Sequence, residues 1–376
     1  MLKLLITHPY YWPYVRRGAE GYIYGLSQYL SKRGYEIEII TSKPGKSETT
    51  VYKDIPVHYW HQFENPLLKK LGIRPELSFM PNVLWSLLRE KFDIAHSFFY
   101  TDGFAAYLSN MVKSTRYIVN FNGVPVKAHF SPRQKFLIKK AFQSASSIIV
   151  FSEHAKNYLW EDYKKEGIII PGAVDLARFN IAREKDLDRP KILCTAAINE
   201  PRKNVHLLVK AFELFKTKVP RAILQLSGHV DPQEAQRLIN SVNPQIRESI
   251  HVLGVGNVQD LPRLYAEAAF SVLPSIGEAF GIVLIESLAC GTPVVGTDNG
   301  GIPEIICDPK IGVLFKYNPP TNSRLNIANL CEAMLQALNL AHAPETADRC
   351  REHAKQYDWN IIGRRFEEVY RMVLNG

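Results

Sequence analysis

The sequence predicts an α/β protein built from two doubly wound domains. Three observations support this prediction. The chain has 376 residues, which is more than a single hydrophobic core usually serves. Short β-rich runs alternate with helical runs from the start of the chain, and the alternation begins again after an irregular, charged stretch at 182–190 that we interpret as a linker. Strands that alternate with helices favour right-handed crossovers onto a parallel sheet.

The elements follow in order along the chain. In the first half we expect strands at 2–7, 36–41, 93–98, 116–121, 147–152 and 167–171, with a helix at 19–33. In the second half we expect strands at 191–198, 221–227, 250–255, 270–274, 293–297 and 313–316, and an amphipathic helix at 359–374. Ligands of such sheets bind at the carboxyl ends of the strands, so the expected binding site is a central cleft that the two domains face.

The composition narrows the class of protein. No run of about twenty apolar residues exists, and residues 1–9 read straight into a strand and loop without a cleavable signal. We therefore expect a cytoplasmic protein. The five cysteines are odd in number and lack a Cys-x-x-Cys spacing, which predicts buried, reduced thiols rather than disulfides or a zinc site.

The net charge of +9 is concentrated in the first half of the chain. Residues 1–180 carry 24 Lys or Arg against 15 Asp or Glu, whereas residues 181–376 carry 22 of each. The basic residues of 131–142 fall on an amphipathic helix. This half is suited to the anionic inner face of a membrane or to an anionic acceptor, and a merely solvated surface is the open alternative. We expect no nucleic-acid binding, because no recognition helix, zinc site or stacking sheet accompanies the charge.

Two acids, Glu278 and Glu286, stand eight positions apart, the first before an apolar segment and the second inside it. An ionised Glu286 in such a segment needs hydrogen-bonding partners, which a hydroxyl-rich ligand can supply. A helix that starts near Gly281 directs its unpaired N–H groups at the loop carrying Glu278, which suits a phosphate. The amides of Phe280, Gly281 and Ile282 would complete this anion site. The open alternative is a structural role for both acids. In that case Glu278 interacts favourably with the helix dipole, and Glu286 is satisfied by a backbone neighbour.

The segment from Pro274 to Gly296, with the Gly-Gly-Ile-Pro-Glu turn that ends at Glu304, resembles the retaining glycosyltransferases of family 4, also called group 1. Weaker similarities run along nearly the whole chain, at 18–20, 92–96, 151–154, 171–175, 201–205 and 261–265. The resemblance implies the GT-B fold, in which two Rossmann-like domains face a central cleft. It also implies that Glu278 contacts the donor sugar and that Glu286 contacts the nucleotide ribose.

Within this resemblance, the expected domains are an acceptor-binding domain at 1–180, a nucleotide-sugar-binding domain at 181–355, and a C-terminal helix at 356–376 that crosses back to the first domain. Arg202 and Lys203 lie at a strand-to-helix junction, where a guanidinium, an ammonium and helix N–H groups converge on phosphate. The resemblance makes Lys203 the diphosphate lysine. Taken alone, the Arg-Lys pair is also compatible with exposed surface charge.

Two positions depart from the family pattern in their charge. Family members place an arginine five or six residues before the lysine, where this chain has Ala197 and Ile198. They also place a histidine before a glycine at the end of a first-domain strand, where this chain has Asn122. Asn122 can hydrogen-bond a sugar hydroxyl but cannot titrate as histidine does.

A third departure lies after the first strand. The family has two consecutive glycines there, which bring backbone amides to the donor phosphate. This chain keeps Gly18 but has Arg17 in the first place. The candidates to replace the positive charge of the family's missing arginine are Arg202, Arg16 and Arg17.

These observations predict a metal-independent, hexosyl-type retaining glycosyltransferase that moves a sugar from a nucleotide-diphosphate donor to a hydroxyl acceptor, whether glycan, lipid-linked or small molecule. The predicted catalytic residues are Glu278, Lys203 and Asn122. No cofactor is expected beyond the nucleotide-diphosphate sugar as co-substrate, since metal-ligand spacings and Gly-x-Gly-x-x-Gly are missing. A non-catalytic nucleotide-sugar-binding protein and a nucleotide-sugar epimerase are the alternatives.

Overall fold

The computed structural model describes residues 2–15, 17–63, 75–121, 131–256, 258–318 and 323–376. The chain divides into two compact units. Met1–Gly172 and Trp359–Gly376 form the first unit, and Ala173–Asp358 forms the second. The last helix therefore belongs to the same unit as the beginning of the chain. From the sequence we place the boundaries at residues 180 and 355.

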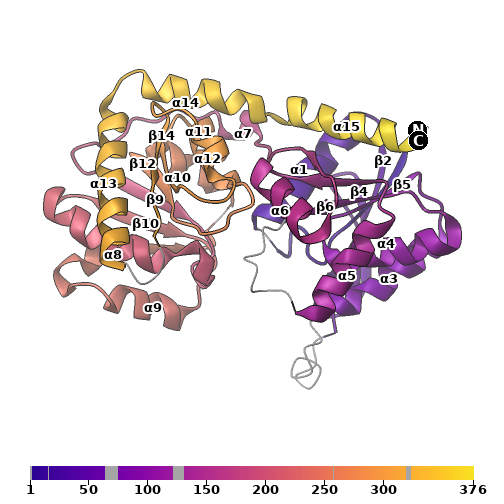
Figure 1. Cartoon of the computed structure of the whole chain (residues 1–376). Helices are drawn as coiled ribbons and strands as arrows, with labels where there is room; N and C mark the ends of the chain where they lie inside the picture. Colours follow the sequence, from indigo (N-terminus) through magenta and orange to yellow (C-terminus); the bar gives the residue numbers. More distant parts are fainter. Residues whose placement is uncertain (1, 16, 64–74, 122–130, 257, 319–322) are drawn as a thin grey trace. The chain divides into compact units, whose positions relative to one another are not determined.

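The first unit contains an eight-stranded sheet (Figure 1). Its order is β3-β4-β2-β1-β5-β6-β7-β8, and every neighbouring pair is parallel except β3 with β4. Buried aliphatic residues form the central strands, as a sheet covered on both faces requires. The strands are β1 (Lys3–Thr7), β2 (Glu36–Lys43), β3 (Glu48–Tyr52), β4 (Ile55–His61), β5 (Ile94–Ser97), β6 (Tyr117–Phe121), β7 (Ser147–Val150) and β8 (Ile168–Ile169).

The antiparallel β3–β4 hairpin was not predicted from the sequence. Its two strands are joined by Lys53 and Asp54, whose φ angles are 52° and 65°. Two-residue hairpin loops that need positive φ at both positions usually carry Asn-Gly or Asp-Gly. Lys-Asp lacks the glycine of that signal, so the turn is not recognisable from residue types alone.

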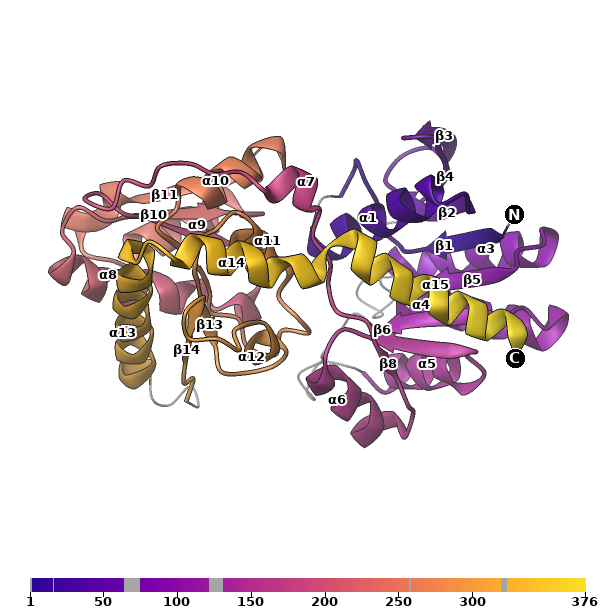
Figure 2. The same cartoon turned by 90° about the horizontal axis from the view of Figure 1, so that it is seen from above.

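Helices cover both faces of this sheet. α3 (Pro75–Arg89), α4 (Tyr100–Lys113) and α5 (Pro132–Gln143) lie side by side (Figures 1 and 2). They bury Phe79, Ile138 and Phe142 in one core with Val119 of β6. The remaining helices are α1 (Gly18–Lys32), α6 (Glu153–Tyr163) and α15 (Trp359–Asn375).

The C-terminal helix α15 packs on α1 through both apolar and polar contacts. The centres of the Tyr22 and Trp359 rings lie 5.2 Å apart. The buried carboxylate of Glu367 accepts hydrogen bonds from Tyr29 Oη at 2.9 Å and from Arg33 Nε at 3.1 Å. These contacts hold the end of the chain against its beginning.

The second unit contains a six-stranded parallel sheet in the order β11-β10-β9-β12-β13-β14. The prediction of an α/β fold with two parallel-sheet domains is therefore confirmed. The strands are β9 (Lys191–Thr195), β10 (Ile223–Ser227), β11 (Ile250–Gly254), β12 (Phe270–Leu273), β13 (Val294–Thr297) and β14 (Gly312–Phe315).

Helices also flank the second sheet, and α13 lies beside α8 and β14 (Figure 2). Phe212, Phe215 and Phe270 are fully buried in the core between α8 and the sheet. The α-helices are α7 (Leu176–Phe179), α8 (Val205–Lys218), α9 (Pro232–Asn240), α10 (Leu261–Glu267), α11 (Ile282–Ala289), α12 (Ile302–Ile305), α13 (Ser323–His342) and α14 (Thr346–Ala354). One-turn 3-10 helices occur at Pro201–Lys203, Val258–Asp260 and Lys355–Tyr357, with a longer one at Pro244–Ser249.

The stretch at 182–190, expected to be a linker, instead packs on the second unit. Lys185 Nζ donates to the carbonyl oxygens of Ala268 at 2.9 Å and Gly291 at 3.3 Å, and to Thr292 Oγ1 at 2.6 Å. Burial lowers the pKa of Lys185 to about 8. A lysine in a charged run is usually exposed to solvent. Lys185 is instead partly buried, because three oxygen atoms accept hydrogen bonds from its ammonium group.

The cysteine prediction needs one correction. Cys194, Cys290, Cys331 and Cys350 are buried and unpaired, whereas Cys307 is exposed because it follows the short helix α12 in a surface loop. Among the described residues, no helix combines the length and the apolar character needed to cross a membrane.

Candidate functional site

The predicted site residues of the second unit come from loops at one edge of its sheet. Arg202 and Lys203 follow β9, Glu278 follows β12, and the Gly300-Gly301 turn follows β13. β12 pairs with both β9 and β13, so the three loops are neighbours (Figure 1). The sheet grows from β9 through β10 in one direction and through β12 in the other. Ligands of open α/β sheets bind where the direction of growth reverses in this way.

Two cations and one acid meet at this edge. Lys203 Nζ lies 2.7 Å from Glu278 Oε2, and Arg202 Nη1 lies 3.2 Å from the same oxygen. Arg202 also donates through Nε to Glu200. The Lys203 and Glu278 side chains are only 15% and 14% exposed. The structure thus brings three predicted residues into one largely buried ion-pair cluster.

The charges in this cluster decide the ionisation of Glu278. Burial alone would raise the pKa of its carboxyl, but the neighbouring charges of Lys203 and Arg202 outweigh burial, and the pKa is lowered. The same pairing raises the pKa of Arg202 against its own desolvation. Glu278 is therefore a carboxylate at neutral pH, and the cations hold it where an anionic ligand would also bind.

Backbone contacts fix the loop that carries Glu278. The amide of Ile276 donates to the Arg202 carbonyl at 2.8 Å, and the amide of Gly301 donates to the Glu278 carbonyl at 2.8 Å. Gly300 has a φ of +69°, and a Cβ atom there would lie 2.4 Å from the Glu278 carbonyl oxygen. Only glycine allows this approach. The Gly-Gly turn therefore positions Glu278 by close backbone packing.

Helix α11 begins where the sequence predicts. Gly281 precedes it with a φ of +113°, and Ile282 is its first residue. The amide of Leu284 in the first turn donates to the Gly281 carbonyl at 2.8 Å. The amides before it precede the point where the regular hydrogen bonds of the helix begin, and they lie directly after the loop that carries Glu278. The predicted anion-binding amides of Phe280, Gly281 and Ile282 are thus at the start of α11, on the same loop-helix junction as the ion-pair cluster.

Glu286 lies in the middle of α11 and is partly buried. Burial raises the pKa of its carboxyl to about 7, against the opposing charge of Arg178 and a hydrogen bond from Tyr265. Tyr265 Oη donates to Glu286 Oε2 at 3.1 Å, and Tyr265 itself is 1% exposed. Glu286 therefore changes between neutral and charged forms near neutral pH.

Three further residues belong to this site and were not predicted. Tyr265 donates to Glu286, the charge of Arg178 acts on Glu286, and Asn299 Oδ1 accepts from the Gly277 amide at 2.8 Å. Tyr265 falls in the 261–265 stretch that resembles the family, which is a signal that could have identified it. Arg178 and Asn299 lack a comparable signal in a single sequence.

The other predicted residues lie elsewhere. Gly18 is the first residue of α1 in the first unit. Arg17 Nη2 donates to Glu20 at 2.9 Å, and its guanidinium lies 5.0 Å from the centre of the Tyr10 ring. Asn122 and Arg16 lie outside the described residues. Of the two positions that correspond to the family's arginine, Ile198 is 4% exposed in the core of the second unit and Ala197 is partly buried, so both carry apolar side chains.

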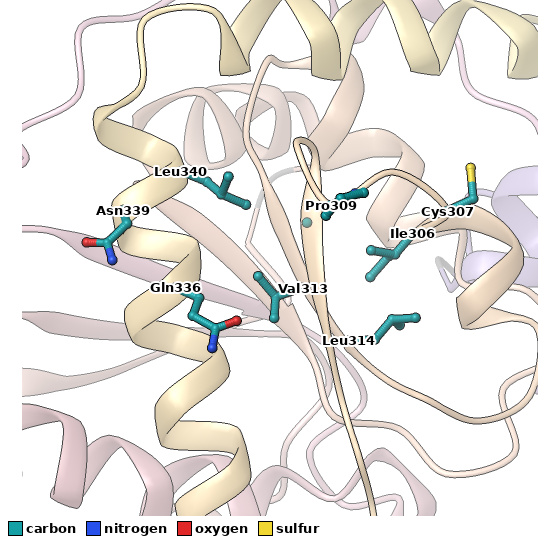
Figure 3. Close-up of a pocket in the computed structure, with 9 residues that line it drawn as sticks. Ile306, Cys307, Pro309, Val313, Leu314, Gln336, Asn339 and Leu340 are labelled. Atoms are coloured by element: carbon teal, nitrogen blue, oxygen red, sulfur yellow. The ribbon is translucent and has the colours of Figure 1, made fainter.

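A separate hollow of about 500 Å³ lies between the edge strand β14 and α13 (Figure 3). Val313 and Leu314 line it from the strand, and Gln336 and Leu340 line it from the helix. It contains none of the predicted site residues. Within the described ranges, no three His, Cys, Asp or Glu side chains are grouped as metal ligands, and metal independence of the reaction stays a prediction.

Comparison with known proteins identifies two family matches that together span most of the chain. Residues 178–357 match the family described as Glycosyl transferases group 1, and residues 16–178 match Glycosyltransferase Family 4. A phosphatidyl-myo-inositol mannosyltransferase of Mycobacterium tuberculosis is 26% identical over 231 residues. That match covers 60% of this chain and only 59% of the mannosyltransferase.

Solved structures share the fold. Sucrose-phosphate synthase from Thermosynechococcus elongatus aligns over 100% of both chains with a TM-score of 0.83 and 19% identity. Anabaena HepE, solved in complex with UDP-glucose, aligns over 99% of this chain and 100% of its own with a TM-score of 0.74 and 17% identity. The GT-B fold predicted from the sequence is therefore confirmed. The chain belongs to the group 1, or family 4, glycosyltransferases.

Proposed function

We propose that the chain is a retaining glycosyltransferase that moves a hexosyl group from a nucleotide-diphosphate sugar to a hydroxyl acceptor. The observation that carries this proposal is the buried cluster of Arg202, Lys203 and Glu278 at the carboxyl ends of β9 and β12. The relatives support it: one is named a mannosyltransferase, and another was solved with UDP-glucose.

The cations act on the leaving group. When the bond between the anomeric carbon and the donor oxygen breaks, the electron pair stays on the diphosphate, whose negative charge increases. Lys203 and Arg202 donate to its oxygens, together with the amides of Phe280, Gly281 and Ile282. Because these donors are already oriented, they stabilise the charge that develops in the transition state. We assign a further amide contact to Gly18.

The two glutamates hold the hydroxyl-rich parts of the donor. In the structure both cations donate to Glu278, and a diphosphate competes with the carboxylate for the same donors. The released Glu278 then accepts from hydroxyls of the transferred sugar. Glu286 accepts from the ribose hydroxyls, and Asn122 hydrogen-bonds the sugar or the acceptor.

The two halves of the chain bind different substrates. We assign the acceptor to residues 1–180 and the donor to residues 181–355, with 356–376 returning to the first unit. The reaction uses no metal ion and no cofactor besides the donor. The basic first half lies at the inner face of a membrane, and the acceptor is a glycan, a lipid-linked sugar or a small molecule.

A panel of nucleotide sugars tests the proposal. Purified protein is incubated with each donor, and nucleoside diphosphate release is measured with and without EDTA. We expect release with at least one donor, unaffected by EDTA, and a product whose anomeric proton coupling matches the donor's configuration. Glu278→Gln should abolish release, while the exposed acid variant Glu248→Gln should not. Nucleotide binding by calorimetry without turnover for any donor would contradict the proposal and indicate a binding protein.

A further inference from the structure

The first unit contains a long stretch without acidic residues. Between Asp102 and Glu153 the sequence has seven Lys or Arg and no Asp or Glu. Asp102 itself is fully buried, so it does not offset the charge at the surface. This stretch includes most of α4, all of β6 and α5, and β7. The positive charge of the first half is therefore concentrated on neighbouring elements.

Helix α5 presents the centre of this charge. Ser131 and Gln134 form a capping box that fixes its start, and Ile138 and Phe142 pack into the core. On the opposite side Phe136 is 54% exposed. Arg133, Lys139 and Lys140 stand three or four positions from Phe136, so they flank it on the same face of the helix.

The neighbouring elements extend this face. Lys140 Nζ lies 5.6 Å from the centre of the Tyr107 ring of α4 and 5.9 Å from that of Phe136. The end of α4 exposes Met111 by 68% and Val112 by 73%. Figure 1 shows α4 and α5 side by side on the first sheet. We call the exposed side of these two helices the α4–α5 face, made by Met111, Val112, Lys113, Arg133, Lys135, Phe136, Lys139 and Lys140.

The charges of this face are not neutralised by the described part of the protein. Neither Arg133 nor any of the three lysines of α5 forms an ion pair with a carboxylate among the described residues. Lys140 donates to the side chain of Gln143, a neutral group. Cations that lack carboxylate partners are available to an external anionic surface.

We propose that the α4–α5 face is a docking surface for an anionic phospholipid bilayer. The lysines and Arg133 contact lipid phosphates, while Phe136, Met111 and Val112 enter the headgroup region. Each cation near an anionic leaflet contributes about a fivefold gain in binding. Exposed apolar side chains among the cations favour a membrane over nucleic acid, because a phosphate backbone offers them no apolar phase. Docking of this face to a bilayer does not depend on the proposed sugar transfer.

Vesicle flotation of the full chain tests this surface. The vesicles contain either phosphatidylcholine alone or phosphatidylcholine with phosphatidylglycerol. We expect binding to the anionic vesicles only, weakened by high salt. The double variant Lys135→Glu/Lys139→Glu should lose binding more than tenfold, and Phe136→Ser should weaken it at unchanged charge. The matched control, Arg364→Glu/Arg365→Glu on exposed positions of α15, makes the same charge change on another helix and should lose far less.

Three results would overturn the proposal: no binding to anionic vesicles, equal loss in the α15 control, or tighter binding to an oligonucleotide that Phe136→Ser leaves unchanged. Thermal unfolding of each variant separates lost binding from lost folding. Donor hydrolysis in the absence of vesicles should be unchanged by Lys135→Glu/Lys139→Glu, which separates a failure of docking from a failure of the proposed transfer.

Discussion

The hydroxyl of Tyr265 donates to Glu286 Oε2 at 3.1 Å, and this hydrogen bond joins α10 to α11 in the second unit. Burial nevertheless raises the pKa of Glu286 to about 7, because one hydroxyl and the charge of Arg178 only partly compensate for lost water. The carboxyl group that we propose to bind the ribose is thus about half protonated at neutral pH.

The affinity for nucleotide should therefore depend on pH. In the proposed role of Glu286, its carboxylate form accepts from the ribose hydroxyls, so the proton must leave before the nucleotide binds fully. Below the pKa of about 7, we expect the apparent affinity to fall by up to tenfold for each pH unit. Calorimetry with a nucleoside diphosphate across this range measures the slope, and Glu286→Gln should flatten it. An equal slope in that variant would assign the proton to another group.

The raised pKa of Glu286 should also make the stability of the ligand-free protein depend on pH. The folded state binds the Glu286 proton more tightly than the unfolded chain, whose reference pKa is 4.5. The free energy of unfolding contributed by this residue should fall as pH rises from that value toward 7, and stay constant above it. Denaturant unfolding of the wild type and of Glu286→Gln at several pH values measures the difference, which should grow in the variant's favour with rising pH.

Substitutions of Lys203 and Glu278 should compensate for each other in the free energy of unfolding but not in the rate of turnover. Lys203→Met leaves Glu278 with Arg202 as its cation, which should cost about 1–3 kcal/mol of unfolding free energy and reduce turnover by about 100- to 1000-fold. Adding Glu278→Gln removes the buried carboxylate that has lost one of its two cations, so stability should recover while turnover does not. The exposed pair of Lys355 and Glu352 is the matched control. If Lys355→Met costs as much stability, the buried pair has no special role.

The fold was largely predictable because each local signal agrees with the sheet it builds. The apolar runs and the helical periods between them place the parallel strands to within a few residues, as β1 at Lys3–Thr7 and β13 at Val294–Thr297 show. The hairpin after β2 was missed because its turn uses Lys53 and Asp54 at positive φ without a glycine. In that hairpin the paired strands, rather than the turn residues, impose the conformation.

The candidate site was predictable where its residues fall in recognisable motifs, including Lys203 and Glu278, which are 75 residues apart, and unpredictable where a residue joins it through packing alone. Glu278, Gly281 and Glu286 lie on one loop and helix, so their spacing together with the surrounding motif indicates a ligand site. Tyr265 reaches Glu286 from α10, which is 21 residues away in sequence. That contact depends on how α10 and α11 pack, and a single sequence does not specify such packing.

Glu367 should be needed to hold α15 on α1. Its buried carboxylate accepts from Tyr29 Oη and Arg33 Nε, so Glu367→Ala leaves a buried hydroxyl without its acceptor. We expect a loss of about 1–3 kcal/mol in unfolding free energy. The next residue, Glu368, is exposed, and Glu368→Ala should change stability by less than about 0.5 kcal/mol. Similar losses in both variants would show that helix propensity, not the hydrogen bonds, is responsible.

A single thiol should react in the native protein. Cys307 is exposed, whereas the other four cysteines are buried, and burial raises the pKa of Cys194, Cys290 and Cys350 to about 12. Thiolates are the reactive form, so these buried groups should be inert until the chain unfolds. Titration with Ellman's reagent should give one fast thiol per native chain and five in guanidinium. Cys307→Ser should remove the fast phase alone. A fast phase that persists in this variant would mean that one of the buried cysteines is reached through opening of the second unit.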